Sequence, residues 1–292
     1  MKKGNKLFFI LACILCTTFF IAYATLAIIR HTHYQSFGYD LGINDQVIWN
    51  YSNFHLPYST IHPFPGETKL QTHVEIVYGL IAPFYWLWSD AIMSLLLQTF
   101  FVCSGGIALY LLAKKRNIHR AINFTLIISY LAFYGVQNAL WSDVHSASFA
   151  AAFLAWFIYF LDSKKFWLTL FFAFLAITAK ENIAVLTLLI SFVYFIKRRD
   201  KLTTIIMLSS SIYLLFIYLL YFPHVINHEY LYKNSEGLVS NINPISMFDS
   251  HEKREAIFYS LGSFGFIPLL LPLLLIPIFG DFATYFILAS EL

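Results

Sequence analysis

Two carboxylates that could carry out acid–base chemistry, Asp40 and Asp45, stand in the segment FGYDLGINDQVIWN, residues 37–50. A helix starting at Leu41 would place Ile43, Val47, Ile48, Tyr51 and Phe54 on one stripe and Asp45, Trp49 and Ser52 on the opposite face. We predict a short amphipathic helix that lies on a bilayer surface, with Asp40 at its start. Asp40 is a candidate catalytic base and also a candidate helix cap. Asp45 is a second catalytic candidate, with a merely solvated residue as the alternative.

Further ionisable side chains flank the apolar segments. They are Arg30, His73, Glu75, Asp143, His145, Lys180 and Glu181. Ionisable groups beside apolar spans are costly and usually functional, so we predict that these bind a substrate or its phosphate. The plainer alternatives are ordinary polar span ends for Asp143 and His145 and an interfacial anchor for Lys180. The residue types allow a divalent metal ion shared by Asp45 and Asp143, although the sequence has no HExxH motif.

The composition is that of a polytopic, all-α membrane protein. Of the 292 residues, 59 % are hydrophobic and 12 % are charged, whereas a soluble domain has about 25 % charged residues. Cys13, Cys16 and Cys103 all lie in apolar segments, so we expect buried apolar residues rather than a redox or metal site. Because no internal repeat or long linker is visible, we predict one integral membrane domain over residues 1–292.

Apolar segments predict about eight spans. They cover residues 7–29, 91–113, 121–140, 146–161, 166–179, 183–196, 202–222 and 263–279. The first segment could instead be a signal peptide with an A-x-A site at residues 22–24, but its apolar run exceeds the usual length of about 7–15 residues. The segment Val74–Trp88, interrupted by Pro83, is too short to cross and is predicted to be interfacial or re-entrant.

The distribution of charge predicts the topology. The N-terminus and the turns 114–120, 163–165 and 197–201 hold most of the 19 Lys and Arg residues, but few of the acids or histidines. Cytoplasmic loops accumulate Lys and Arg. We therefore expect a cytoplasmic N-terminus in the cell membrane, and outer loops at about residues 30–90 and 223–262 that carry the acidic and histidine side chains.

Several segments together resemble a family of predicted membrane proteins in the GT-C glycosyltransferase superfamily. The matching pieces are FGYDLGINDQVIWN, THVEIVYGLIAPFYWLWSD, LLLQTF, WSDVHSASFA, TAKENIAVL and LPLLLIPIF. The resemblance covers most of residues 34–280. It implies a GT-C-like helix bundle, a polyprenyl-phosphate-linked sugar donor, and a catalytic carboxylate in the first outer loop beside an interfacial helix, which puts Asp40 at the base position. Relatives look longer, so we expect a shortened member.

The predicted function is sugar transfer at the outer face of the membrane. The chain lacks the phosphate-binding patterns GxGxxG and GxxxxGK[ST], which favours a lipid-linked donor over a nucleotide sugar. Asp40 would take the proton of the acceptor hydroxyl, and Lys180, with His145 or Arg30, would stabilise the departing phosphate. Glu181 could position Lys180. We expect a lipid-linked sugar and membrane lipids as partners, and no nucleic acid. A transporter or flippase and a non-catalytic membrane partner are the alternatives.

Overall fold

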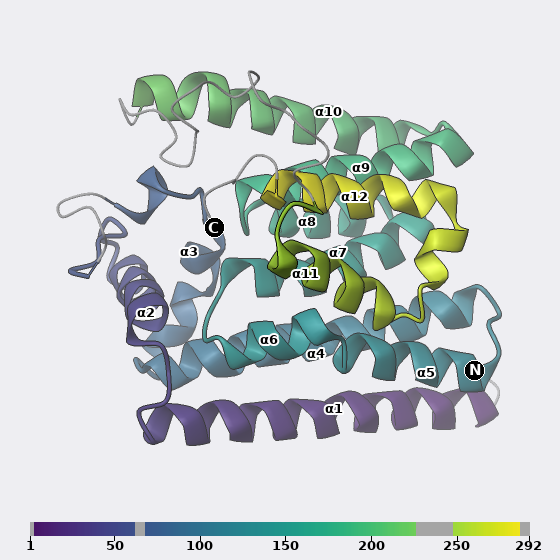
Figure 1. Ribbon diagram of the computed structural model, residues 1–292, viewed down its shortest axis with the longest axis horizontal. Helices are drawn as coiled ribbons and strands as arrows, with labels where there is room; N and C mark the ends of the chain where they lie inside the picture. The colour runs from purple at the N-terminus through teal and green to yellow at the C-terminus, as the bar shows by residue number, and fades with distance from the viewer. Residues whose placement is uncertain (1–2, 62–67, 226–247, 287–292) are drawn as a thin grey trace. The chain divides into compact units, whose positions relative to one another are not determined.

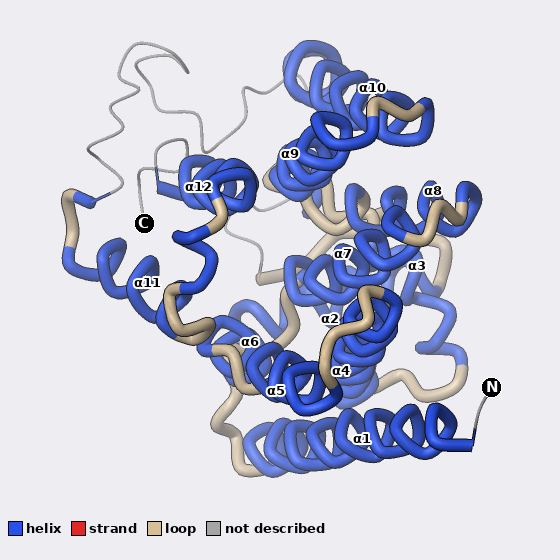
Figure 2. The backbone as a smooth tube through the Cα atoms, turned by 90° about the vertical axis from the view of Figure 1, so that its right-hand side faces the viewer, coloured by secondary structure: helices blue, strands red, loops and turns tan. Residues whose placement is uncertain are grey.

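The computed structural model describes residues 3–61, 68–225 and 248–286. Regular structure in this part of the chain is helical, apart from one isolated bridge between Tyr58 and Thr68, which confirms the all-α class. The chain divides into two compact units. Unit 1 comprises Met1–Lys69 and Glu75–Ala179, and unit 2 comprises Leu70–Val74 and Lys180–Leu292. Figures 1 and 2 trace their helices, and each unit is described by itself.

Three helices are long and apolar enough to cross a membrane: Lys6–Thr32, Ala91–Lys115 and Lys201–His224. Crossing requires about 20 residues at 1.5 Å per residue, so these three confirm the predicted spans at 7–29, 91–113 and 202–222 as membrane-length helices. Three shorter apolar helices also form: Ser146–Asp162, Phe166–Ile177 and Pro272–Thr284. The full set of eight spans and its orientation stay predictions.

Unit 1 is organised around α4 (Ala91–Lys115). α1 (Lys3–Thr32), α5 (Arg120–Leu131) and α7 (Ser146–Asp162) all pack on α4, and α8 (Phe166–Ile177) packs on α7 (Figure 1). Asp143, before α7, contacts Gln98 near the start of α4, whereas Asp162, the last residue of α7, contacts Lys115 at the end of α4, so the residues before and after α7 lie at opposite ends of the unit. This arrangement gives unit 1 two separate polar ends.

The core between α1, α4 and α5 depends on small residues. Its buried members are Ala12, Cys16, Cys103, Tyr110, Ile127 and Leu131. A Cβ atom added at Gly106 would lie 2.9 Å from the Cys16 sulfur, so glycine permits the close approach of α1 and α4. Cys16 and Cys103 are buried and Cys13 is half-buried, all as free thiols, which agrees with their predicted packing role.

Two predicted spans are wrong as single helices. Residues 121–140 form α5 and then α6 (Tyr134–Trp141), because the chain is extended at Phe133 while the Gln137 side chain donates to the carbonyl of Ala132. Residues 263–279 follow α11 (His251–Gly262) as a turn, the 3₁₀ helix η5 (Ile267–Leu270) and α12 (Pro272–Phe286). The reasons there are a positive φ at Phe266 and the missing N–H of Pro272.

The segments around α2 (Gly38–Ser52) lack membrane-length helices. η1 (Lys69–Gln71), α3 (Val77–Ile81) and the 3₁₀ helix η2 (Ala82–Trp86) are each a turn or so long, as the interruption at Pro83 predicts. α2 confirms the predicted helix but begins earlier, with Phe37 as its cap residue. Asp40 therefore lies inside the first turn and does not cap it.

The predicted apolar stripe of α2 is partly wrong. Ile43, Val47 and Ile48 are buried as expected, but Ser52 is buried too. Phe54 lies beyond the helix end and is 86 % exposed. The difference arises because α2 packs against α3, η2 and α4, so protein contacts as well as apolar character decide which face is buried.

Unit 2 is built on α9 (Glu181–Arg198), which packs against α10 (Lys201–Phe216) and α12. α10 continues as a π-helix, η3 (Ile217–Val225), around Pro223. Between α9 and α10, Arg199 adopts a positive φ, and Asp200 caps α10 by accepting from the Thr203 N–H at 2.9 Å. The predicted loop 223–262 contains α11, and residues 62–67 and 226–247 of the two predicted outer loops lie outside the described residues.

Candidate functional site

A polar corner in unit 1, residues 142–145 between α6 and α7, is built around Asp143. Asp143 is 2 % exposed, and its Oδ2 accepts the Phe37 N–H at 2.6 Å. Its Oδ1 lies 4.0 Å from Nη1 of Arg30, which also donates to the carbonyls of Trp141 and, at 2.9 Å, Gln35. Asp143 and Arg30 therefore fasten the end of α1, the entry to α2 and the corner to one another.

Two buried amides hold the backbone of the corner. Nε2 of Gln98 in α4 donates to the Asp143 carbonyl at 2.8 Å, and its Oε1 accepts the His145 N–H at 2.7 Å. Nδ2 of Asn44 in α2 donates to the Val144 carbonyl at 2.8 Å. Buried backbone groups need such partners, above all in apolar surroundings. Sequence reasoning missed both amides, although a glutamine inside the apolar run LLLQTF was a visible signal.

Asp40 is the exposed carboxylate beside this corner. It shares a helix face with Asn44, one turn further along α2. The negative charge of Asp40 makes a minor contribution to the raised pKa values of Asp143 and of the buried Tyr78 in α3. Within the described residues, no hydrogen bond or ion pair engages the Asp40 side chain. The carboxylate is therefore open to a substrate.

Asp45 is placed differently, although it belongs to the same helix. Its Oδ1 accepts the Tyr85 hydroxyl of η2 at 2.6 Å. Burial raises the pKa of Asp45 and the charge of Asp90 adds to this, while the Tyr85 hydrogen bond opposes it. Five residues correspond to about 140° around a helix, so Asp40 and Asp45 do not converge on one point.

Burial likewise raises the pKa of Asp143 itself. The hydrogen bond from the Phe37 N–H and the charges of Arg30 and His145 oppose this shift without cancelling it. Nε2 of the His145 ring lies 3.1 Å from the Ser142 carbonyl oxygen. The corner thus holds Asp143 in surroundings that disfavour negative charge, beside an exposed Asp40.

Glu75 supports the first turn of α7. It is 6 % exposed, and its Oε1 accepts the Ser146 hydroxyl at 2.5 Å. Its Oε2 lies 3.3 Å from Nζ of Lys69, a partner that sequence reasoning did not identify. A carboxylate near a helix N-terminus is stabilised by the helix dipole. The position therefore suits a structural anion whose charge Lys69 balances.

A second ionic cluster lies in unit 2 at the start of α9. Glu181 is 1 % exposed, and its two oxygens meet Nδ1 of His73 at 2.7 Å and the Val74 N–H at 3.1 Å. Burial alone would raise the pKa of Glu181, but the charge and hydrogen bond of His73, with the charge of Lys180, lower it to about 2. Glu181 is thus a buried anion that contacts His73 and Val74, and Lys180 precedes it as the cap residue of α9.

The nine predicted site residues therefore divide between the units. Unit 1 holds Arg30, Asp40, Asp45, Glu75, Asp143 and His145, and unit 2 holds His73, Lys180 and Glu181. Within the described part of the chain, no three His, Cys, Asp or Glu side chains converge so as to hold a metal ion. The neighbours His73 and Glu75 have separate partners, in unit 2 and unit 1 respectively.

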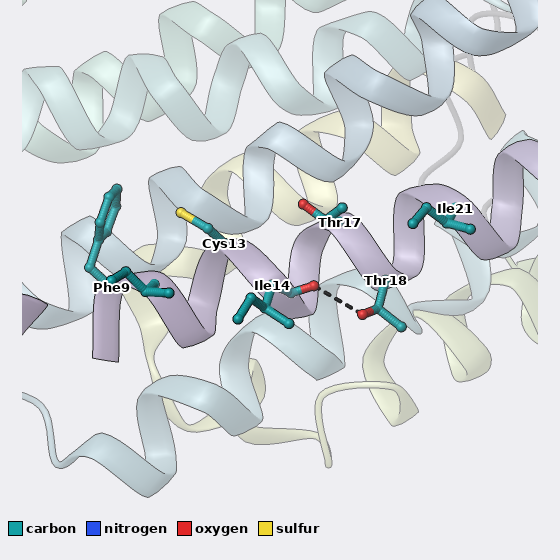
Figure 3. A pocket seen from close by; sticks show the side chains of 7 residues that line it. Phe9, Cys13, Ile14, Thr17, Thr18 and Ile21 are labelled. Atoms are coloured by element: carbon teal, nitrogen blue, oxygen red, sulfur yellow. Dashed lines mark hydrogen bonds between the residues drawn. The ribbon is translucent and has the colours of Figure 1, made fainter. Parts of the chain in front are cut away.

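A hollow of about 420 Å³ lies along α1, away from these charged groups (Figure 3). It is lined by Phe9, Ile10, Cys13, Ile14, Thr17, Thr18 and Ile21. Thr18 donates to the Ile14 carbonyl at 3.0 Å within the helix. The last lining residue, Ile21, precedes Arg30 by about 13 Å along the helix axis. This apolar hollow is therefore distinct from the polar corner.

Membrane-length helices and the apolar composition define an all-α membrane protein with a polar corner at one end of unit 1. The chain belongs to the family described as Predicted membrane protein (DUF2079), whose sequence profile matches residues 30–290. The matched range includes every candidate residue from Arg30 to Glu181. Comparisons with curated proteins and with solved structures gave no match. The resemblance to a family of predicted membrane proteins is confirmed, and the family description assigns no reaction.

Proposed function

We propose that this protein is a GT-C-like glycosyltransferase that moves a sugar from a polyprenyl-phosphate donor to an acceptor at the outer face of the cell membrane. One observation carries the proposal. Asp45, Glu75, Asp143 and Glu181 are each held by a hydrogen bond or an ion pair. Asp40 is exposed and unengaged among the described residues, which is the state that a general base needs before its substrate arrives.

The reaction requires one proton acceptor and one leaving group. The acceptor hydroxyl oxygen forms a bond to the anomeric carbon of the sugar as the bond from that carbon to the phosphate oxygen breaks. The hydroxyl proton passes to Asp40, and the bonding electron pair leaves with the lipid phosphate. General-base assistance of this kind contributes about 10²–10⁴-fold to a rate.

The surroundings of Asp40 suit a lipid-linked substrate. Phe37 and Tyr39, on either side of Gly38 in the same turn, are 59 % and 53 % exposed. Exposed aromatic rings are favoured at membrane interfaces, where an apolar body meets a polar edge. We assign the role of general base to Asp40, with Asp45 as a more distant carboxylate that orients the acceptor.

The phosphate side calls for a cation. In unit 1, Arg30 and His145 flank the corner beside Asp143. In unit 2, Lys180 remains a candidate because of its position in the sequence, at the junction of two apolar segments. Arg30 already binds three chain groups, so its role is to hold the corner and reduce its negative charge.

The test is transfer of a radiolabelled sugar from polyprenyl phosphate by purified, membrane-reconstituted protein, using a panel of donors. We expect Asp40→Asn to lose at least 100-fold in rate while its helical content and unfolding temperature stay those of the wild type. Asp249→Asn, at an exposed carboxylate that pairs with Lys253 in unit 2, is the matched control and should keep full activity.

Two results would overturn the proposal. One is a folded Asp40→Asn variant that transfers sugar as fast as the wild type. The other is a wild type that is inert with every donor, together with a cellular function that persists in the Asp40→Asn variant. The latter result would favour a transporter or a non-catalytic membrane partner.

A further inference from the structure

The end of unit 1 opposite the polar corner carries a cluster of cations, which we call the basic end. Its members come from the start of α1 and from the turns that follow α4 and α7: Lys6, Lys114, Lys115, Arg116, Arg120, Lys164 and Lys165. Asp162, the last residue of α7, is the one acid among them in the described chain. Figure 1 shows these turns on the right, at the end of α1 that bears the N-terminus.

Asp162 fixes two of the cations. It is 3 % exposed, and its Oδ2 accepts from Lys115 Nζ at 2.8 Å while its Oδ1 accepts from Arg116. The Asp162 carbonyl oxygen also accepts from Lys115. The carboxylate is therefore buried beneath the two cations, whose side chains remain 40 % and 56 % exposed.

The neighbouring turn adds two more exposed cations. Lys164 and Lys165 connect α7 to α8, and Lys164 has a φ of 55°, a region that glycine usually occupies at this position after a helix. With Lys115 and Arg116 held against Asp162, four positive side chains open to solvent at one place. A single buried carboxylate leaves the group with a large excess of positive charge.

An exposed tryptophan lies beside this cluster. Trp167, in the first turn of α8, is 78 % exposed and directly follows the two lysines and Phe166. Tryptophan side chains on membrane proteins prefer the boundary between headgroups and acyl chains. A membrane-length helix, α4, also ends at this cluster.

We propose that the basic end binds the phosphate of an anionic phospholipid, with Lys164 and Lys165 contacting the headgroup and Trp167 lying beside the upper acyl chain. Lys115 and Arg116, fixed by Asp162, complete the phosphate site. Arginine and lysine bind phosphate oxygens through charge-assisted hydrogen bonds, and basic pockets beside membrane helices recognise acidic headgroups. This site is independent of sugar transfer at the opposite end of unit 1.

The test uses the full chain in nanodiscs that contain brominated lipids, which quench nearby tryptophan fluorescence. The signal of Trp167 is obtained by subtracting the signal of the Trp167→Phe variant. We expect brominated phosphatidylglycerol to bind beside Trp167 about tenfold more strongly than brominated phosphatidylcholine. Raising the salt concentration to 1 M should reduce this preference, because exposed charges are screened.

The double substitution Lys164→Gln and Lys165→Gln should bring the preference close to unity. Arg254→Gln, at an exposed arginine of α11 in unit 2, should leave it unchanged. Equal quenching of the wild type by both lipids would refute the proposal, whether or not the double variant folds. So would a double variant that keeps the full preference. Displacement of the anionic lipid by a short single-stranded DNA at equal charge would instead point to nucleic acid as the ligand.

Discussion

Two buried aspartates lie at the two ends of α7, and the cations beside them differ in their exposure to solvent. At the polar corner, Asp143 lies near Arg30, whose side chain is only 6 % exposed. At the basic end, Asp162 binds Lys115 and Arg116, which remain largely exposed. The same residue type therefore serves two purposes. One carboxylate neutralises a buried cation to fix a backbone corner, and the other holds cations in place for an external anion.

The comparison predicts unequal costs for removing the two carboxylates. Asp143→Ala would leave Arg30 buried without its counterion and the Phe37 N–H without its acceptor, so we expect a loss of about 3–5 kcal/mol in the free energy of unfolding. Asp162→Ala should cost about 1 kcal/mol, because Lys115 and Arg116 can return to water. Urea unfolding in one detergent, followed by circular dichroism, measures both.

The matched variants Asp143→Asn and Asp162→Asn control for lost volume. Asparagine keeps an oxygen that can accept from the Phe37 N–H, so Asp143→Asn should lose less than Asp143→Ala. If Asp143→Ala and Asp162→Ala lose equal stability, it is wrong that a carboxylate beside a buried cation contributes more to stability than one beside exposed cations.

Acid titration extends the comparison to unit 2. The pKa of Glu181 is lowered to about 2 in the folded protein, against about 4.3 when unfolded. Its stabilising contribution of about 3 kcal/mol is therefore present above pH 4.3 and is lost as the pH falls towards 2. The raised pKa values of Asp45 and Asp143 give the opposite pH dependence: each carboxylate binds a proton more readily in the folded than in the unfolded chain, so its contribution to stability increases as the pH falls.

The measurement is the unfolding free energy of the wild type minus that of Glu181→Gln, from pH 6 to pH 2. We expect the difference to shrink steadily below pH 4.3 and then level out. A difference that stays constant over this range would show that Glu181 is not a buried, ionised partner of His73.

The smallest effect concerns the amide that holds the corner. Gln98→Met should leave the Asp143 carbonyl and the His145 N–H without partners and cost about 2 kcal/mol in the free energy of unfolding. Gln137→Met is the matched control, because Gln137 is an exposed amide that donates to the Ala132 carbonyl, and its cost should stay below about 1 kcal/mol. Equal costs for the two variants would contradict the bracing role of Gln98.

The sequence was most successful in predicting the long helices, because each one requires only a long, uninterrupted run of apolar residues. The spans at 7–29 and 91–113 reappear as α1 and α4 because about 20 consecutive apolar residues leave few alternatives to a long helix. The break at Phe133 was not predictable in this way, because no proline marks it. Pro268 and Pro272, by contrast, were readable signals against a single helix over 263–279.

The candidate site was less predictable because its contacts join distant positions. Asp143 meets Phe37 and Arg30 from more than 100 residues away, and Gln98 reaches the corner from within an apolar helix. Residue type alone identified Asp143, Glu75 and Glu181 as unusual. It could not show that each is held by the chain itself, nor that Asp40 and Asp45 face different neighbours, because tertiary packing decides which polar groups are satisfied.

The short segment Leu70–Val74 packs with unit 2, although the residues on both of its sides belong to unit 1. It supplies His73 and the Val74 N–H to Glu181, and Val74 packs with Ile217 and Phe222. During synthesis these five residues leave the ribosome about a hundred residues ahead of α9, so unit 2 cannot finish assembling from its own contiguous stretch. A polypeptide that starts at Lys180 would lack the His73 ring and the Val74 N–H that bind the buried Glu181 carboxylate, so a gene divided there would have to supply this segment to the second half.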